Sequence, residues 1–344
     1  MEIKFSSSID AKKAYELVTK LQSHFVNKLN NLSKELAENK PFKEVLWQRD
    51  EGIHGGGNRY EACDELLFNT ASVNVSQVHY DDEPNKRLRS ASAISTIIHP
   101  KNPNVPSMHM HISFTELENE QSYFRIMADL NPAIEFQEDK DKFTCTIANF
   151  ANNTYEEGTA QGDKYFNIPA LNRHRGVVHF YLENYKTQNK QADFDFASDF
   201  GTGIINTYID IIDNAFKNRT SFSVHDIKKQ LSYHTLYLFQ VLTLDRGTTS
   251  GLLVHNQNDA GIMGSLPRFV DKNLLASWEK LVPTPQDELV RKLVEVIPSN
   301  GHIDIDTKIK LAEAVRNHYK TYPESLKYQA SGNTIPTTVD NHKK

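Results

Sequence analysis

Three histidines lie within a short stretch that also carries three prolines, ISTIIHPKNPNVPSMHMHISF, residues 94–114. Imidazole titrates near neutral pH and binds metals, so His99, His109 and His111 are candidates for acid–base catalysis or metal ligation. Proline lacks the N–H that a central strand donates, so HPKNPNVP predicts a rigid connection between two strands. In SMHMHISF the residues alternate, which places His109 and His111 on one face of the second strand, about 7 Å apart.

The other face of this second strand is apolar, since it carries Met108, Met110, Ile112 and Phe114, and we expect it to pack against the core. The spacing alone favours a polar, solvated sheet face over a metal site, because a metal usually needs a third or fourth anchored ligand. General acid–base catalysis is the other functional interpretation.

The composition excludes some classes of protein. The 344 residues carry a formal net charge of −5 with a sequence pI of about 6.3, and no basic stripe is present, so we expect no nucleic acid partner. The two cysteines, Cys63 and Cys145, have no CxxC neighbours, which is typical of free thiols in a reducing compartment. We find no signal peptide and no run of about 18 apolar residues, so we expect a cytoplasmic protein without a membrane span.

The elements that position the histidines are helices and short strands in irregular order. Apolar residues at spacings of three and four predict a long first helix over 9–38, capped by Ser8 or Asp10. GIHGGGN, residues 52–58, is interpreted as a glycine-rich loop. Strands are expected over 66–79, 92–99, 107–115, 122–130 and 176–185. Further helices are expected over 134–153, 196–219, 285–297 and 305–322, and a short one near 224–231 that leads into a strand ending at LTLDRGT. This order favours an α+β fold with a largely antiparallel sheet.

The histidine stretch resembles the signature of oxygen-dependent coproporphyrinogen III oxidases, a strand followed by His-Pro-x-x-Pro-x-x-Pro-x-x-His. Other segments are similar to family motifs in the same order: WQRDEGIHGGGNRYE (47–61), VNVSQVHY (73–80), ADLNP (128–132), HRGVVHFYLENY (174–185), LDRGTTSGL (244–252) and IMGSLP (262–267). The resemblance covers roughly residues 10–282. It implies a large, nearly flat antiparallel sheet flanked by helices on both sides, within a homodimer.

This resemblance also implies a domain organisation and a reaction. Residues 1–282 would form the oxidase-like domain, 283–325 a C-terminal helical extension, and 326–344 a polar tail that we expect to be disordered. The family converts two propionates of coproporphyrinogen III to vinyl groups, giving the protoporphyrinogen IX of haem biosynthesis. Molecular oxygen is the co-substrate, and no organic cofactor takes part.

The resemblance assigns roles to individual residues. His109 matches the proposed proton donor, Asp129 the carboxylate that faces the pyrroles, and Arg246 the arginine that binds a propionate. His99 and His109 match divalent-metal ligands of some members. The expected substrate-binding residues are Ser95, His111, Arg175 and Asp245, of which His111 is an addition of this sequence. The structural alternative is that Asp129 and the Asp-Arg-Gly-Thr turn cap secondary-structure elements.

The sequence also departs from the family pattern. Ser113 stands where the family has an arginine. Three family glycines are replaced by Arg125, Ile126 and Met127, and a Gly-Gly-Arg loop is replaced by HNQND (255–259). We therefore hypothesise that Arg125 supplies a displaced guanidinium, and that His111 or His179 supplies a displaced imidazole. Three functions stay open: a coproporphyrinogen oxidase, a family member acting on another substrate with or without a metal, and a non-catalytic tetrapyrrole-binding protein.

Overall fold

The structure is a computed structural model, which describes residues 2–119 and 121–333. Within these residues, seven strands form one fully antiparallel sheet in the spatial order β1-β2-β3-β4-β5-β6-β9. The strands of this sheet are β1 (Lys43–Gln48), β2 (Gly55–Glu61), β3 (Phe68–His79), β4 (Leu88–Pro100), β5 (Ser107–Leu117), β6 (Ser122–Asn131) and β9 (Val178–Tyr185). A separate short pair joins β7 (Asn167–Ile168) and β8 (Arg173–His174).

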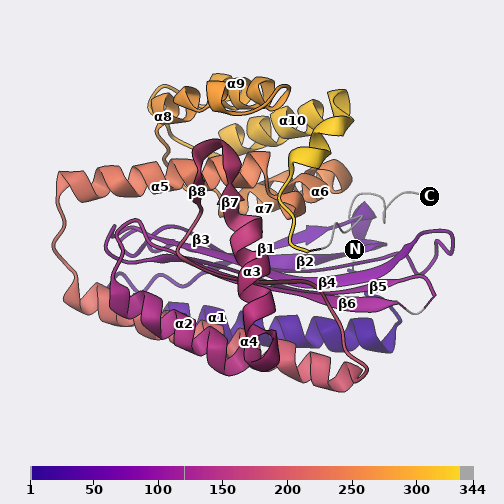
Figure 1. Cartoon of the computed structure of the whole chain (residues 1–344). Helices are drawn as coiled ribbons and strands as arrows, with labels where there is room; N and C mark the ends of the chain where they lie inside the picture. The colour runs from indigo at the N-terminus through magenta and orange to yellow at the C-terminus, as the bar shows by residue number, and fades with distance from the viewer. Residues whose placement is uncertain (1, 120, 334–344) are drawn as a thin grey trace.

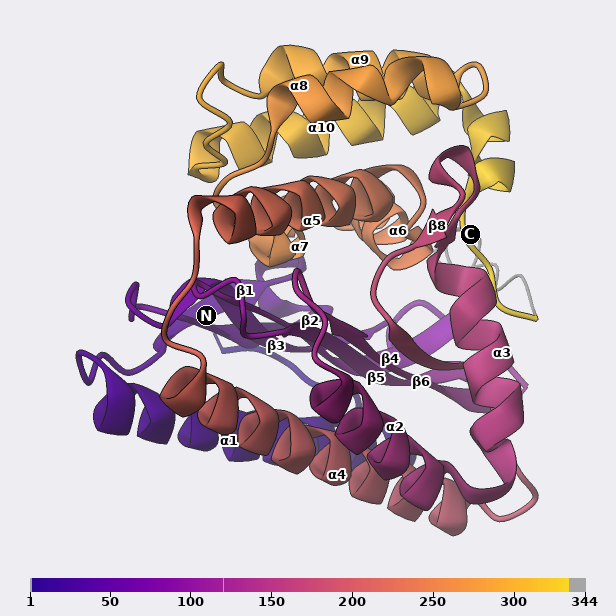
Figure 2. The ribbon, with the colours of Figure 1, turned by 60° about the vertical axis from the view of Figure 1, so that its left-hand side comes forward.

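Helices cover both faces of the main sheet, as Figures 1 and 2 show. One face packs against α1 (Ile9–Leu36), α2 (Gln137–Ala151) and α4 (Lys190–Asn218), and α3 (Tyr155–Phe166) runs along the edge strand β9. The other face lies below α5 (Val224–Thr243), α6 (Arg246–Val254) and α7 (Asp259–Ile262). A further layer beyond α5 contains α8 (Lys272–Ser277), α9 (Gln286–Val296) and α10 (Ile305–Thr321). The α+β class is confirmed.

The alternation of residues in the strands decides which face meets which layer. Met108, Met110 and Ile112 of β5 are fully buried among residues of α1 and α4, as the sequence predicted. The Pro-rich connection between β4 and β5 is confirmed for residues 101–106, whereas His99 and Pro100 of the expected connection are the last two residues of β4. The opposite face of β5 carries His109 and His111 and faces the α5–α6 layer.

Two expected elements differ from the structure. Residues 224–243 form one continuous helix, α5, so the strand expected before LTLDRGT is wrong. Every residue from 233 to 243 is buried, the polar His234 and Gln240 included, so this half of the helix lacks the one-sided apolar pattern that identifies an amphipathic helix. The glycine-rich loop is wrong for Gly55 to Gly57, which belong to β2. A Cβ at Gly57 would lie 2.0 Å from the Val75 carbonyl oxygen, so this strand needs glycine for close pairing with β3.

The residues after 282 pack onto the rest of the chain. Leu289, Leu293 and Leu311 share one apolar cluster with Leu238 and Leu242 of α5. In the expected tail, Gln329 and Gly332 are buried and Ala330 packs against an apolar cluster, whereas residues 334–344 lie outside the described residues. Between residues 2 and 333, with 120 left aside, none of the helices combines the length and apolar character that crossing a membrane requires.

Candidate active site

A cavity of about 250 Å³ lies between the polar face of the sheet and the α5–α7 layer, and it opens to solvent. The pairing register of the strands builds its floor in rows. One row runs through Asn74, Ser95, His111, Met127 and Tyr181 on five neighbouring strands. All five side chains line the cavity. Residues that oppose each other in antiparallel strands share a face, so the register alone brings these distant segments together.

A parallel row carries the charged cluster that contains three of the predicted residues. His109 opposes Asp129, and Arg175 joins them from the turn before β9. The Asp129 carboxylate accepts hydrogen bonds from Arg175 Nη2 at 2.7 Å, from His109 Nδ1 at 2.8 Å and from Asn131 Nδ2 at 2.6 Å. Arg175 Nη1 also donates to Gln240 Oε1 at 2.7 Å. Asp129 and Arg175 are almost completely enclosed, with side-chain exposures of 0% and 1%.

The electrostatics of this cluster fix the protonation states. Burial by itself raises the pKa of Asp129, but the charges of Arg175 and His109 outweigh it and hold that pKa well below the ordinary value. Burial opposes ionisation of Arg175, yet Asp129 raises the pKa of Arg175 above its ordinary value. An ionised carboxylate only accepts hydrogen bonds, so His109 Nδ1 carries a proton and donates it to Asp129. The His109 side chain also lines the cavity.

The structure places Asp129 behind the cavity wall. Among the described residues, His109 and Arg175 line the cavity but Asp129 does not. The resemblance assigned Asp129 to direct contact with the pyrroles. In the structure the Asp129 carboxylate forms its hydrogen bonds with His109, Arg175 and Asn131, and its contact with the pyrroles stays a prediction.

His111 lies in the row that runs from Asn74 to Tyr181, and it faces the cavity as predicted. Burial, followed by the charges of His109 and Arg125, lowers the pKa of His111 to about 3. His111 is therefore neutral near pH 7, and its Nε2 lies 3.0 Å from Ser113 Oγ. A neutral imidazole can form a hydrogen bond with a ligand but does not form an ion pair with a carboxylate.

The turn between α5 and α6 supplies the upper wall. Asp245 is the N-cap of α6, accepts hydrogen bonds from the Thr248 backbone N–H at 2.6 Å and from the Tyr165 hydroxyl at 2.9 Å, and also lines the cavity. The structural role considered for this turn is therefore present, as a helix cap. Arg246 donates through Nη1 to Glu183 at 3.2 Å and lines the cavity with an exposure of 13%.

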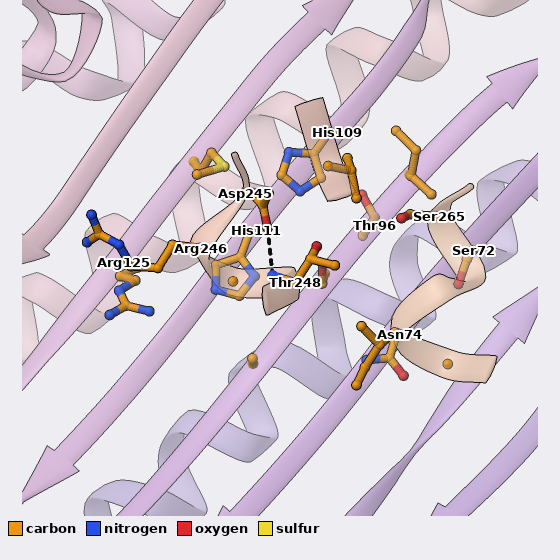
Figure 3. A pocket seen from close by; sticks show the side chains of 18 of the residues that line it. Ser72, Asn74, Thr96, His109, His111, Arg125, Asp245, Arg246, Thr248 and Ser265 are labelled. Atoms are coloured by element: carbon orange, nitrogen blue, oxygen red, sulfur yellow. Dashed lines mark hydrogen bonds between the residues drawn. The ribbon is translucent and has the colours of Figure 1, made fainter. Parts of the chain in front are cut away.

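Arg125 adds a second guanidinium at the same end of the cavity. Figure 3 shows Arg125 and Arg246 at one end, and Ser72, Asn74 and Ser265 at the other. In the register of β5 and β6, Arg125 lies directly opposite Ser113. The arginine that the resemblance expects at 113 thus has a counterpart on the neighbouring strand, on the same face of the sheet.

His99 lies apart from these groups. It is fully buried, its Nδ1 lies 3.0 Å from Ser107 Oγ, and its ring packs against His234 and Tyr237. Burial, with a smaller contribution from His234, holds the pKa of His99 well below its ordinary value. Across residues 2–119 and 121–333, no group of three or more His, Cys, Asp or Glu is arranged to hold a metal ion. The donor set around His99 and His109 therefore does not match a metal site, and we derive no metal-dependent step; the metal assignment stays a prediction.

Sequence reasoning missed Tyr165, Tyr181 and Glu183. Tyr181 and Glu183 belong to the alternating series of β9 that also contains His179, so a period-two reading of VHFYLENY identifies their face. His179 itself is turned to Asp163, with its Nδ1 2.8 Å from the carboxylate, and is not among the described residues that line the cavity. The hypothesis of a displaced imidazole therefore favours His111.

The structure thus belongs to the α+β class, with an antiparallel sheet and an arginine-lined cavity between it and a helical layer. The comparisons with known proteins specify the family: the model of coproporphyrinogen III oxidase matches residues 13–297, and the chain belongs to this family. The oxygen-dependent coproporphyrinogen-III oxidase of Drosophila melanogaster is 28% identical over 307 residues, covering 82% of this chain and 75% of the fly protein. The mitochondrial proteins of that name from Homo sapiens and Rattus norvegicus are each 27% identical over 281 residues. These matches cover 74% of this chain, 60% of the human protein and 61% of the rat protein.

Proposed function

We propose that this chain catalyses the oxidative decarboxylation of coproporphyrinogen III propionates to vinyl groups, with O₂ as oxidant, giving protoporphyrinogen IX for haem biosynthesis. Membership of the family supports the reaction class. The observation that carries the proposal is the arrangement of Arg125, Arg246 and His109 around one cavity. Guanidinium groups bind carboxylates through paired donors, and an imidazole exchanges protons near neutral pH.

The atoms of the proposed step balance without an organic cofactor. A propionate loses CO₂ and one hydrogen from its β-carbon, and a vinyl double bond forms between the two remaining side-chain carbons. O₂ receives two electrons, that hydrogen and one further proton, and leaves as hydrogen peroxide. The side chains bind the carboxylate, deliver the proton and limit the access of water.

The predicted site residues other than His99 each receive a role in this proposal. Arg246 and Arg125 bind propionates, and His109 Nε2 is the proton donor. Asp129, from behind the cavity wall, fixes the tautomer and orientation of His109, and Arg175 holds Asp129 in place, so both are positioning residues. Ser95 and His111, which are paired on the cavity floor, form hydrogen bonds with the substrate. Asp245 fixes the turn that carries Arg246.

The size of the cavity limits how the substrate can bind. About 250 Å³ is below the range of about 300–1,000 Å³ that is common for ligand pockets. Met127, which replaces a family glycine, occupies part of the floor. A reacting propionate and its pyrrole can lie inside while the rest of the macrocycle extends through the opening, since each decarboxylation involves one propionate.

The same observation supports a second candidate function, the oxidation of a smaller carboxylate substrate such as a monopyrrole propionate. A substrate series separates the candidates. Turnover of coproporphyrinogen III with no turnover of monopyrroles supports the first, and the reverse supports the second. Binding of coproporphyrinogen III without turnover would indicate the non-catalytic tetrapyrrole-binding protein.

The deciding experiment compares wild-type protein with His109→Gln and Arg246→Gln in an aerobic assay of coproporphyrinogen III, followed by product fluorescence and mass. We expect His109→Gln to lower kcat and Arg246→Gln to raise KM. Arg268→Gln is the matched control, because Arg268 pairs with exposed Glu65 at 2.6 Å and does not line the cavity. Equal activity of all four proteins would refute the assignment of the site.

A homodimer and a cytoplasmic location complete the proposal. The family resemblance supports the homodimer, and sedimentation of the purified chain tests it. Two of the relatives carry "mitochondrial" in their names, so the compartment needs a direct test by fractionation of the source cells.

A further inference from the structure

A short segment near the end of the described chain lies against the cavity. Residues 329–333, here called the strap, follow the last helical turn, Pro323–Tyr328, and lie beyond the part of the chain that the family model matches. In Figure 1 the segment descends from the region of α10 towards the sheet, beside α3. No motif in the sequence analysis pointed to it.

The strap is anchored at two backbone positions. The Ala330 N–H donates to the Leu244 carbonyl at 2.9 Å, at the end of α5. Lys164 Nζ of α3 donates to the Gly332 carbonyl at 2.6 Å. Gly332 is packed so closely that a Cβ there would lie 2.8 Å from Gln161 Oε1 and 2.9 Å from Glu183 Oε2. The strap therefore joins α3, β9 and the α5–α6 turn.

The strap also contacts the proposed substrate arginine directly. Arg246 Nη2 donates to the Ala330 carbonyl at 2.9 Å, while Nη1 donates to Glu183 at 3.2 Å. These two acceptors hold both terminal nitrogens of a long side chain that would otherwise lose rotamer entropy when a ligand binds. Because the Ala330 carbonyl is uncharged, it orients the guanidinium without adding a second anion.

The Ala330 side chain closes the wall behind this arginine. It packs against a cluster of Met127, Tyr165, Phe166 and Tyr181. Three members of that cluster, Met127, Tyr165 and Tyr181, line the cavity. The strap thus supports the arginine end of the cavity from outside.

We propose that the strap is a positioning element of the active site, which orients the Arg246 guanidinium for a substrate carboxylate and closes that end of the cavity. The proposal rests on the proposed function for the nature of the ligand. Loss of the strap contact should weaken carboxylate binding and leave the proton transfer at His109 unaffected.

The test uses the full chain with two strap variants. Lys164→Met removes the anchor on Gly332, and Gly332→Val crowds the Gln161 and Glu183 side chains against which the strap packs. Lys320→Met is the control, because Lys320 is an exposed lysine in the last turn of α10 and does not line the cavity. Circular dichroism establishes that each variant is folded. We expect the Kd of coproporphyrin III, a stable tetracarboxylate probe, and the KM of coproporphyrinogen III to rise about tenfold in both strap variants, with kcat within about twofold.

A second readout does not depend on the substrate. Phenylglyoxal modifies accessible arginines, and peptide mass mapping follows Arg246 alone. We expect faster modification of Arg246 in both strap variants than in wild type and Lys320→Met. Unchanged modification rates, or faster modification with unchanged Kd, would overturn the positioning role. If wild-type protein neither binds nor converts the tetrapyrrole, the proposed function fails, and the modification rates still decide whether the strap holds Arg246.

Discussion

The buried carboxylate of Asp129 allows a quantitative test of the site. Replacing it in Asp129→Asn keeps the shape of the side chain but removes the negative charge beside Arg175. Arg175, with 1% exposure, then keeps Gln240 as its strong hydrogen-bond acceptor. Breaking a buried ion pair by removing one partner costs about 3–5 kcal/mol, because the other charge stays buried. At an m-value of about 2 kcal/mol/M, the urea midpoint should fall by about 2 M.

The pair of Asp163 and His179, in which the carboxylate is exposed and the imidazole is buried, is the control. Its atoms are also 2.8 Å apart, but the Asp163 side chain is 56% exposed, so Asp163→Asn should cost less than about 1 kcal/mol. The double variant Asp129→Asn/Arg175→Met should recover part of the loss, since it removes both charges. A loss below about 1 kcal/mol in Asp129→Asn, measured by urea unfolding, would refute the role of Asp129 as a buried counter-ion.

Three further predictions follow from other parts of the molecule. Arg125→Ser should raise the KM for coproporphyrinogen III about tenfold. The double variant Arg125→Ser/Ser113→Arg should restore the KM, because the two positions oppose each other, and an unchanged KM in the single variant would contradict substrate binding by Arg125. Burial lowers the pKa of His99 well below its ordinary value and that of His234 to about 3, so the unfolded chain gains protons below about pH 6.5 while the folded chain does not. The free energy of unfolding should therefore fall as the pH falls from 6.5 towards 3, by about 1.4 kcal/mol per pH unit for each histidine. His234→Gln should make the urea midpoint depend less steeply on pH between pH 6.5 and 5, and an unaltered slope would contradict the lowered pKa of His234. Gly158→Ala should cost about 1–3 kcal/mol, because its Cβ would lie 2.1 Å from the Phe180 ring, and an unchanged Tm in thermal unfolding would show that α3 can move away from β9.

The sequence predicted the faces of the strands well. Alternation in SMHMHISF placed His109 and His111 on one side of β5, and the structure has both on the cavity floor. Pro103 and Pro106 predicted the connection between β4 and β5, because proline cannot donate within a central strand, and Pro100 lies at the last position of β4. These features depend on local covalent geometry, which a sequence states directly.

The positions that depend on strand register and long-range packing were not predictable in the same way. That Arg125 opposes Ser113 requires the exact pairing of β5 with β6, and a shift of one residue would move it to the other face. The all-buried half of α5 gave no helical periodicity, since α8, α9 and the sheet cover it on every side. The strap is polar in sequence, and its role depends on backbone carbonyls that any residue possesses.

The measurement that tests the central claim most directly is the mass of the product formed when the purified wild-type chain meets coproporphyrinogen III and O₂. The proposed site predicts a product that has lost two carboxyl groups as CO₂ and carries two vinyl groups, with one hydrogen peroxide formed for each CO₂. Recovery of unchanged substrate from a folded protein that binds it, with no peroxide formed, would contradict the proposed oxidase function.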